Sequence, residues 1–220
     1  MKILRTEVAN KALEKTVSRE RLTKYLTATG NNLDAALSLY EHNTQLSEAL
    51  YTPLQSLEIC FRNSLHERMS QAYGSDWLTN GTAPLNATAK AAIEDALRKL
   101  RQPIPGDIVA ELKFSFWVSL LGTGYDDTLW RKTIYKGFLT GGGKKRSFVH
   151  GRFNAIRRFR NRVAHHEPIF DSAMQMHDEI IEAIGWMCAH TQAWTAHLSR
   201  FNAVQNARLS RQDSTHNSGT

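Results

Sequence analysis

Apolar residues recur at helical spacing along most of the chain, and no segment alternates apolar and polar residues as a strand does. Residues 33–50 place apolar side chains at intervals of three and four after Asn32, a residue type that caps helices. Residues 53–74 repeat this pattern between Pro53, which suits a first helical turn, and Gly74, which suits a helix end. Two long amphipathic helices are therefore predicted here.

Similar patterns predict further helices over residues 18–30, 86–102, 107–122, 125–138, 146–166 and 171–198. The segment 107–122 is apolar on most sides and is expected to be one buried helix, and 171–198 one long helix capped by Asp171. The sequence thus predicts an all-α fold, with helices packed as a bundle in a single domain over residues 1–203. The polar residues 204–220 are expected to form a flexible tail.

Composition excludes several classes of protein. No apolar run is long enough to span a bilayer, and the first fifteen residues are too charged for a signal peptide, so we expect a cytoplasmic protein without a membrane partner. Cys60 and Cys188 are the only cysteines, and their spacing suggests neither a disulfide framework nor a thiolate metal site.

Positive charge is concentrated in one segment. Residues 144–162 hold eight of the 28 Lys and Arg residues and no acid, whereas the rest of the chain sums to about −1. Clustered cations are what a polyphosphate partner requires, so RNA is the expected partner, although such a run can also be a solvated face. The candidate RNA-binding residues are Lys144, Lys145, Arg157, Arg158 and Arg162.

A helical projection of residues 146–166 separates an apolar side from a polar side. The predicted buried stripe consists of Phe148, Ile156, Phe159 and Val163. His165 and Asn161 fall on the outward side, whereas the adjacent His166 falls on the core side. Arg160 lies at the edge of the stripe, where it points towards a neighbouring helix.

An outward histidine beside arginines can act as a general acid or base on a phosphodiester, since imidazole changes charge near neutral pH. The alternative is that His165 only compensates the negative end of its helix, and the spacing alone favours this second role. The sequence argues against a zinc site at His150, His165 and His166, because no carboxylate or thiolate completes the set and the surroundings are positive. We expect neither a metal ion nor a cofactor.

The segment RNRVAHHEPI, residues 160–169, resembles the motif of the HEPN superfamily of α-helical ribonucleases, in which a polar residue and then a histidine follow an arginine. Arg160, Asn161 and His165 match that motif, with four residues between the arginine and the histidine. Other segments are similar to the Abi-like (abortive-infection) branch of the superfamily and occur in the same order. They are SRERLTKYL, AALSLYEHNTQLSEALYTPLQSLEICFRNSLHERM, YGSDWL, IVAELKFSFWVSLL and LWRKTIYKGF.

This resemblance implies a HEPN-like helical bundle and a metal-independent endoribonuclease, a hydrolase active in antiviral (phage) defence or in a toxin–antitoxin system. It also implies a homodimer and leaves room for an antitoxin or regulatory partner. In that family Arg160 and His165 would be the catalytic pair and Asn161 would organise the site. Glu58, Arg62 and Asn63, in the family-like segment LEICFRN, would support it, with Glu58 orienting Arg160.

Two interpretations remain open at the level of sequence. The first is an active endoribonuclease, and the second is a non-catalytic HEPN module that binds RNA or a protein partner. The intact Arg160 and His165 favour the first.

Overall fold

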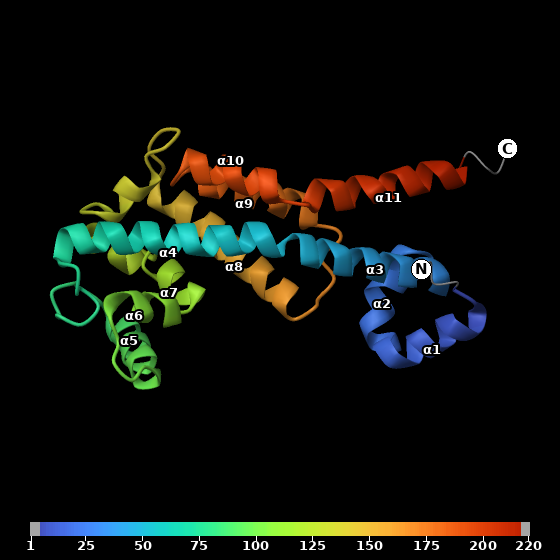
Figure 1. The fold of residues 1–220 in the computed structure, drawn as a ribbon, viewed down its shortest axis with the longest axis horizontal. Helices are drawn as coiled ribbons and strands as arrows, with labels where there is room; N and C mark the ends of the chain where they lie inside the picture. Colours follow the sequence, from blue (N-terminus) through green and yellow to red (C-terminus); the bar gives the residue numbers. More distant parts are fainter. Residues whose placement is uncertain (1–4, 217–220) are drawn as a thin grey trace. The chain divides into compact units, whose positions relative to one another are not determined.

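The computed structural model describes residues 5–216, and every regular element in this range is helical, which confirms the all-α prediction. The helices group into two compact units, drawn together in Figure 1. The first takes in Met1–Tyr51, Asn161–Gln175 and Ser199–Thr220, as far as these ranges are described, and the second takes in Thr52–Arg160 and Met176–Leu198. The sequence pattern gives no sign of this division because three of its four boundaries fall inside continuous helices, not in linkers.

The first unit is built on three helices near the N-terminus and one near the C-terminus. They are α1 (Glu7–Val17), α2 (Arg19–Ala28), α3 (Leu33–Ala49) and α11 (Phe201–His216). Helix α3 packs against the other three. Ser18 and Asn32 cap α2 and α3 through their side chains, as predicted, because each accepts a backbone N–H of the first turn.

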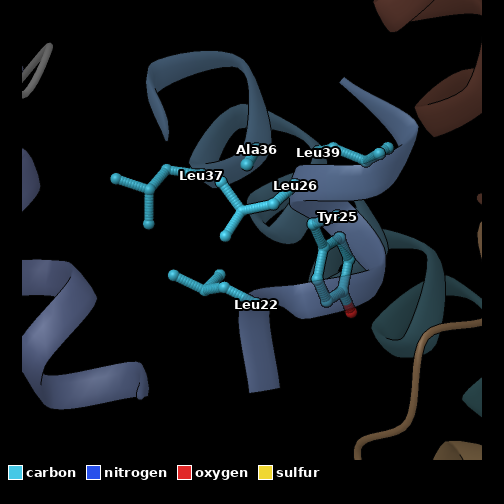
Figure 2. Close-up of a cluster of buried hydrophobic side chains, with 6 residues drawn as sticks. All are labelled: Leu22, Tyr25, Leu26, Ala36, Leu37 and Leu39. Atoms are coloured by element: carbon cyan, nitrogen blue, oxygen red, sulfur yellow. The ribbon is translucent and has the colours of Figure 1, made fainter. Parts of the chain in front are cut away.

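A small core joins α2 to α3 (Figure 2). Leu22, Tyr25 and Leu26 of α2 are buried together with three residues of α3, namely Ala36, Leu37 and Leu39. Burial of each large apolar side chain contributes about 1.5–3 kcal/mol, so this pair of helices has a core of its own.

The second unit contains the longest helix and most of the aromatic residues. Its helices are α4 (Tyr51–Tyr73), α5 (Ala87–Lys99), α6 (Pro105–Glu111), α7 (Phe114–Ser119), most of α8 (Arg146–Ala164), most of α9 (Ala173–Gly185) and α10 (Ala189–Leu198). Three short turns, η1 (Thr123–Tyr125), η2 (Asp126–Trp130) and η3 (Ile134–Phe138), connect α7 to α8. Phe61 of α4 stacks on Phe153 of α8 with 4.0 Å between ring centroids, and its ring edge meets Phe114 of α7. These rings fix α4, α7 and α8 against one another.

Two predicted helices in this unit are wrong. Residues 107–122 form α6 and α7 with a break at Leu112 and Lys113, both in extended conformation, and residues 125–138 form successive 3-10 and π turns in place of an α-helix. In a segment that is apolar on most sides, the spacing of apolar residues does not define one helical face. A break in the helix therefore leaves no visible change in the pattern.

The predicted helix over 171–198 is also wrong, because the chain leaves α9 at Gly185 and starts α10 at Ala189. The Gln192 side chain occupies the space beside Gly185 where a Cβ atom would stand, at 2.5 Å. Because the close atoms are the end atoms of a flexible side chain, a Cβ atom at residue 185 would only require the Gln192 side chain to move. Towards the C-terminus, α11 runs through the boundary that the sequence suggested between residues 203 and 204.

Within the described residues, no helix is both long enough and apolar enough to cross a bilayer. The described chain also contains no group of three or more histidine, cysteine or acidic side chains placed to hold a metal ion.

His66 of α4 accepts a hydrogen bond at its Nδ1 atom from the indole nitrogen of Trp77, at 3.0 Å. Trp77 is buried at the start of the loop after α4. Burial lowers the pKa of His66 below its ordinary value of 6.5, because the charged imidazolium loses solvation. Protonation at Nδ1 would also remove the acceptor on which Trp77 depends.

We expect His66 to make stability sensitive to acid. The unfolded chain takes up the proton at a higher pH than folded His66 does, so the free energy of unfolding should fall as the pH drops below 6.5. His66→Asn keeps an acceptor for Trp77 but does not titrate, and it should reduce the pH slope by up to about 1.4 kcal/mol per pH unit. Urea unfolding at several pH values measures this slope. Equal slopes in the wild type and the variant, with the exposed His197→Asn as control, would contradict the assignment.

Candidate functional site

Helix α8 carries the segment that the sequence singles out. Its buried side consists of Val149, Phe153, Ile156 and Phe159, so two of the four predicted stripe residues are confirmed. Phe148 is instead 50% exposed, and its ring contacts that of Trp186. Val163 is only partly buried. The apolar stripe is rotated about the helix axis relative to the prediction, so that Phe153 stacks on Phe61 of the aromatic cluster and Phe148 does not.

The polar side of the motif agrees with the prediction at two positions and differs at one. Asn161 and His165 are both exposed, as expected. His166 is exposed too, although the projection placed it on the core side. The reason is that α8 ends at Ala164, so helical geometry no longer applies two residues further on.

The predicted contact between Glu58 and Arg160 is present in the second unit. The Nε atom of Arg160 donates to a Glu58 carboxylate oxygen at 2.8 Å, which joins α4 to α8. The Arg160 side chain is 44% exposed and Glu58 28%. Such a half-exposed pair contributes at most about 1 kcal/mol to stability, so its main effect is to fix the direction of the guanidinium.

In the first unit, α8 ends in a Schellman motif. The backbone N–H of His166 donates to the carbonyl of Val163 at 3.1 Å, and that of Glu167 donates to the carbonyl of Arg162 at 2.9 Å. His166 has a φ of 57°, the left-handed conformation that this motif requires and that glycine usually supplies. His165 is the last residue before this turn, and its own N–H still bonds to the carbonyl of Asn161 at 2.9 Å.

Asn43 of α3 holds the chain that follows the motif, a contact that no feature of the sequence predicts. Its side-chain oxygen accepts the N–H groups of Ile169 and Phe170, at 2.7 and 3.1 Å, and its amide donates to the carbonyl of Glu167 at 3.4 Å. Asn43 is 4% exposed, so these bonds form away from solvent. Arg21 of α2 adds a bond to the His166 carbonyl at 3.1 Å.

The remaining supporting residues on α4 are placed less favourably than Glu58. Arg62 is partly buried, and its Nε atom is buried without a hydrogen-bond partner in the described chain. Asn63 is exposed, and no contact of its side chain is found within residues 5–216. Among the contacts of the described residues, Glu58 alone of the three forms a hydrogen bond with a motif residue.

The five candidate RNA-binding residues fall into two groups. Lys145 and Arg158 are exposed, and neither forms an ion pair with the described residues. Lys144 lies over the Trp186 ring at 5.2 Å, and Arg157 is held by the Asn154 side chain at 2.9 Å. Arg162 differs from these because it bonds to the Pro168 carbonyl and to Ser172 at 3.3 Å, with Glu167 and Asp171 nearby. Arg162 therefore closes the turn after α8 and is not free for a phosphate.

Burial lowers the pKa of His150, and the neighbouring Arg146 lowers it further, so this histidine is an unfavourable place for positive charge. Arg146 itself is paired with Asp126 at 3.3 Å. His150 therefore contributes little to anion binding at neutral pH.

Comparisons with protein-family models, with curated proteins and with solved structures find no match to this chain. The functional interpretation consequently depends on the motif residues, their contacts and the resemblance described above.

Replacing Asn43 should destabilise the segment that follows the motif, because its side chain bonds to the backbone there. Asn43→Leu removes the acceptor for two backbone N–H groups and leaves them without partners, so we expect a loss of about 2–4 kcal/mol in the free energy of unfolding. Asn43→Asp retains both acceptor contacts and should lose clearly less. Chemical denaturation of the three proteins measures the difference. Equal losses in both variants would show that the acceptor contacts are not what Asn43 contributes.

His166→Gly should stabilise the chain. Relief of the left-handed conformation is worth about 1–2 kcal/mol, and the extra freedom of glycine in the unfolded chain offsets about 0.5–1 kcal/mol. We therefore expect a net gain of up to about 1.5 kcal/mol. The matched control is His165→Gly, one residue earlier and without a positive φ, which should lower stability. Thermal unfolding of both variants tests this, and a loss in both would contradict the Schellman assignment.

Proposed function

We propose that this chain is a metal-independent endoribonuclease of the HEPN type, acting as an Abi-like effector in phage defence or in a toxin–antitoxin system. The observation that carries the proposal is the ion pair between Glu58 and Arg160. The two residues are 102 positions apart in the sequence, and the resemblance assigns both to one site before any contact between them is known. Support also comes from the exposure of Asn161 and His165 at the end of the same helix.

The geometry of this pair suits a phosphate-binding arginine. Glu58 engages Arg160 through Nε, and the terminal nitrogens of the guanidinium form no hydrogen bond within residues 5–216. Those nitrogens remain able to donate to phosphate oxygens, which guanidinium groups bind in a planar, two-point fashion. Glu58 is therefore a positioning residue, and Arg160 is the group that would stabilise negative charge on the phosphorus oxygens.

RNA supplies its own nucleophile in this mechanism. The 2′-hydroxyl attacks the adjacent phosphorus while a base removes its proton, and an acid protonates the departing 5′-oxygen. The products are a 2′,3′-cyclic phosphate and a 5′-hydroxyl end. His165 is assigned to proton transfer, since imidazole can act as acid or base near neutral pH, and Asn161 to positioning by hydrogen bonds.

Two proton-transfer groups serve this reaction better than one, and each protomer has a single histidine at the third motif position. We therefore propose that a homodimer brings a second His165 to the substrate, by the two-fold symmetry that is commonest among oligomers. Affinity for RNA is assigned to Lys144, Lys145, Arg157 and Arg158, because Arg162 is committed to the turn after α8.

Purified protein incubated with RNA in EDTA should cleave it and leave 2′,3′-cyclic or 3′-phosphate ends. His165→Asn and Arg160→Gln should each lower the cleavage rate at least about a hundredfold, because each removes a group used in the transition state. His197→Asn, which changes an exposed histidine of α10, is the matched control and should be fully active. End-group analysis and RNA binding are measured on all four proteins.

Cleavage that requires magnesium, or products with 5′-phosphates, would contradict the mechanism. RNA binding without cleavage by the wild type would favour the alternative, a non-catalytic HEPN module. Light scattering at the assay concentration tests the dimer, and activity from a strict monomer would exclude a shared site.

A further inference from the structure

An aromatic ring is exposed near the start of α8, in the second unit. Phe148 is 50% exposed, although its ring contacts that of Trp186, which is 4% exposed, with 5.3 Å between ring centroids. Trp186 in turn forms an edge contact with Phe153, and Phe153 stacks on Phe61 in the core. Phe148 is therefore the outermost of four successive rings, held from below and half open to solvent.

Cations surround the two outer rings. The ammonium of Lys144 lies over the Trp186 ring at 5.2 Å, and the guanidinium of Arg152 lies over Trp186 at 5.2 Å and over Phe148 at 5.6 Å. Lys145, three residues before Phe148, is exposed and forms no ion pair with the residues that the structure describes. A cation is attracted to an aromatic face by the ring quadrupole, so these contacts help to fix the orientation of the rings.

Two acids of α9 face this cluster, and both pair with Arg152. Glu179 lies 3.4 Å and Glu182 2.7 Å from its guanidinium, and the Arg152 side chain is 16% exposed. Arg152 therefore supports the rings and is itself neutralised. Three cations against two carboxylates leave the cluster positive, and its uncompensated charge belongs to the two lysines.

We propose that Phe148 is a stacking platform for an unpaired base of single-stranded RNA, and that Lys144 and Lys145 neutralise adjacent phosphates of the same strand. Proteins that bind single strands combine aromatic side chains, on which bases stack, with cations that follow the backbone. A ring already held by Trp186 loses little freedom when a base binds, which favours binding. The inference rests on the proposed function for its ligand, RNA, but uses residues outside the Arg160–His165 motif.

A platform of this kind distinguishes a single strand from a duplex. Within a duplex the faces of the bases are covered by their neighbours, and double-stranded RNA is bound mainly through its phosphates and 2′-hydroxyls. Loss of the Phe148 ring should therefore weaken the binding of a single strand and leave that of a duplex unchanged.

The experiment measures binding of the full-length protein to a short RNA strand, and to a duplex of the same sequence, by fluorescence anisotropy. Every nucleotide carries a 2′-O-methyl group, so the proposed nucleophile is absent and the RNA stays intact. Phe148→Leu should raise the Kd for the single strand about five- to a hundredfold, the effect of losing one stacked base. Phe148→Trp should keep wild-type affinity. Trp194→Leu changes another exposed aromatic residue of the second unit, and as the matched control it should bind normally.

Salt dependence separates stacking from charge. Lys145→Ala should reduce the slope of log Kd against log salt concentration by about 0.7, because one phosphate contact fewer releases fewer counterions. Phe148→Leu should leave this slope unchanged, since stacking releases no ions. Circular dichroism checks that each variant is folded. Photo-crosslinking of the wild type to a strand containing 5-bromouracil requires no substitution, and it should attach RNA to the tryptic peptide 147–152.

The proposal fails if Phe148→Leu binds the single strand as tightly as the wild type, if it weakens single strand and duplex equally, or if no crosslink includes this peptide. It also fails if the wild type binds no RNA, or if Phe148 serves binding to vesicles of phosphatidylserine and phosphatidylcholine and not to RNA. Absence of RNA binding would remove the proposed function too. Binding through Phe148 without cleavage of unmodified RNA would overturn only the ribonuclease, whereas cleavage together with tight binding by Phe148→Leu would overturn only the platform.

Discussion

Helix α8 contains six arginines and no acid, so the carboxylates that balance its charge must come from outside the helix. Like charges three or four residues apart on a helix repel each other, as Arg158 and Arg162 do in this one. The compensating acids are Asp126 for Arg146, Glu179 and Glu182 for Arg152, Glu58 for Arg160, and Glu167 and Asp171 for Arg162. Each pair is partly exposed and weak, but each also fixes one side chain of α8 against a different neighbour.

This distribution of charge changes the functional picture. The sequence presents eight cations as one basic surface, whereas the fold neutralises four of them locally and leaves Lys145 and Arg158 as the exposed, unpaired members in the described chain. A general polyphosphate surface would gain from all eight. A site that reads one phosphate gains more from a single arginine held in a fixed direction, which is what Glu58 provides for Arg160.

The starts of α2 and α3 could be predicted from the sequence, because Ser18 and Asn32 are residue types that commonly cap helix N-termini. The contact between Glu58 and Arg160 could also be predicted, because the family resemblance assigns both residues to one site. The position of Arg160 at the edge of the apolar stripe indicates only that it points towards a neighbouring helix. The breaks within 107–122 and 171–198 could not, because apolar residues continue through both. The exposure of His166 and the hydrogen bonds of Asn43 could not be predicted either, for a related reason. Both depend on how the chain turns after α8, and a helical projection describes only the helix itself.

The segment LEICFRN, about two turns of α4, contacts several different parts of the second unit. Leu57 and Phe61 are fully buried, and Phe61 stacks on Phe153 of α8. Glu58, beside them, reaches Arg160, and Cys60, on another side of α4, is partly buried. Residues three and four apart share a helical face, whereas adjacent residues point about 100° away from each other, so this short segment contacts three surroundings without conflict. The packing of Phe61 sets the depth and rotation of α4, and that rotation determines whether Glu58 can reach its arginine. The orientation of Arg160 is therefore a consequence of core packing on α4 as much as of the ion pair itself.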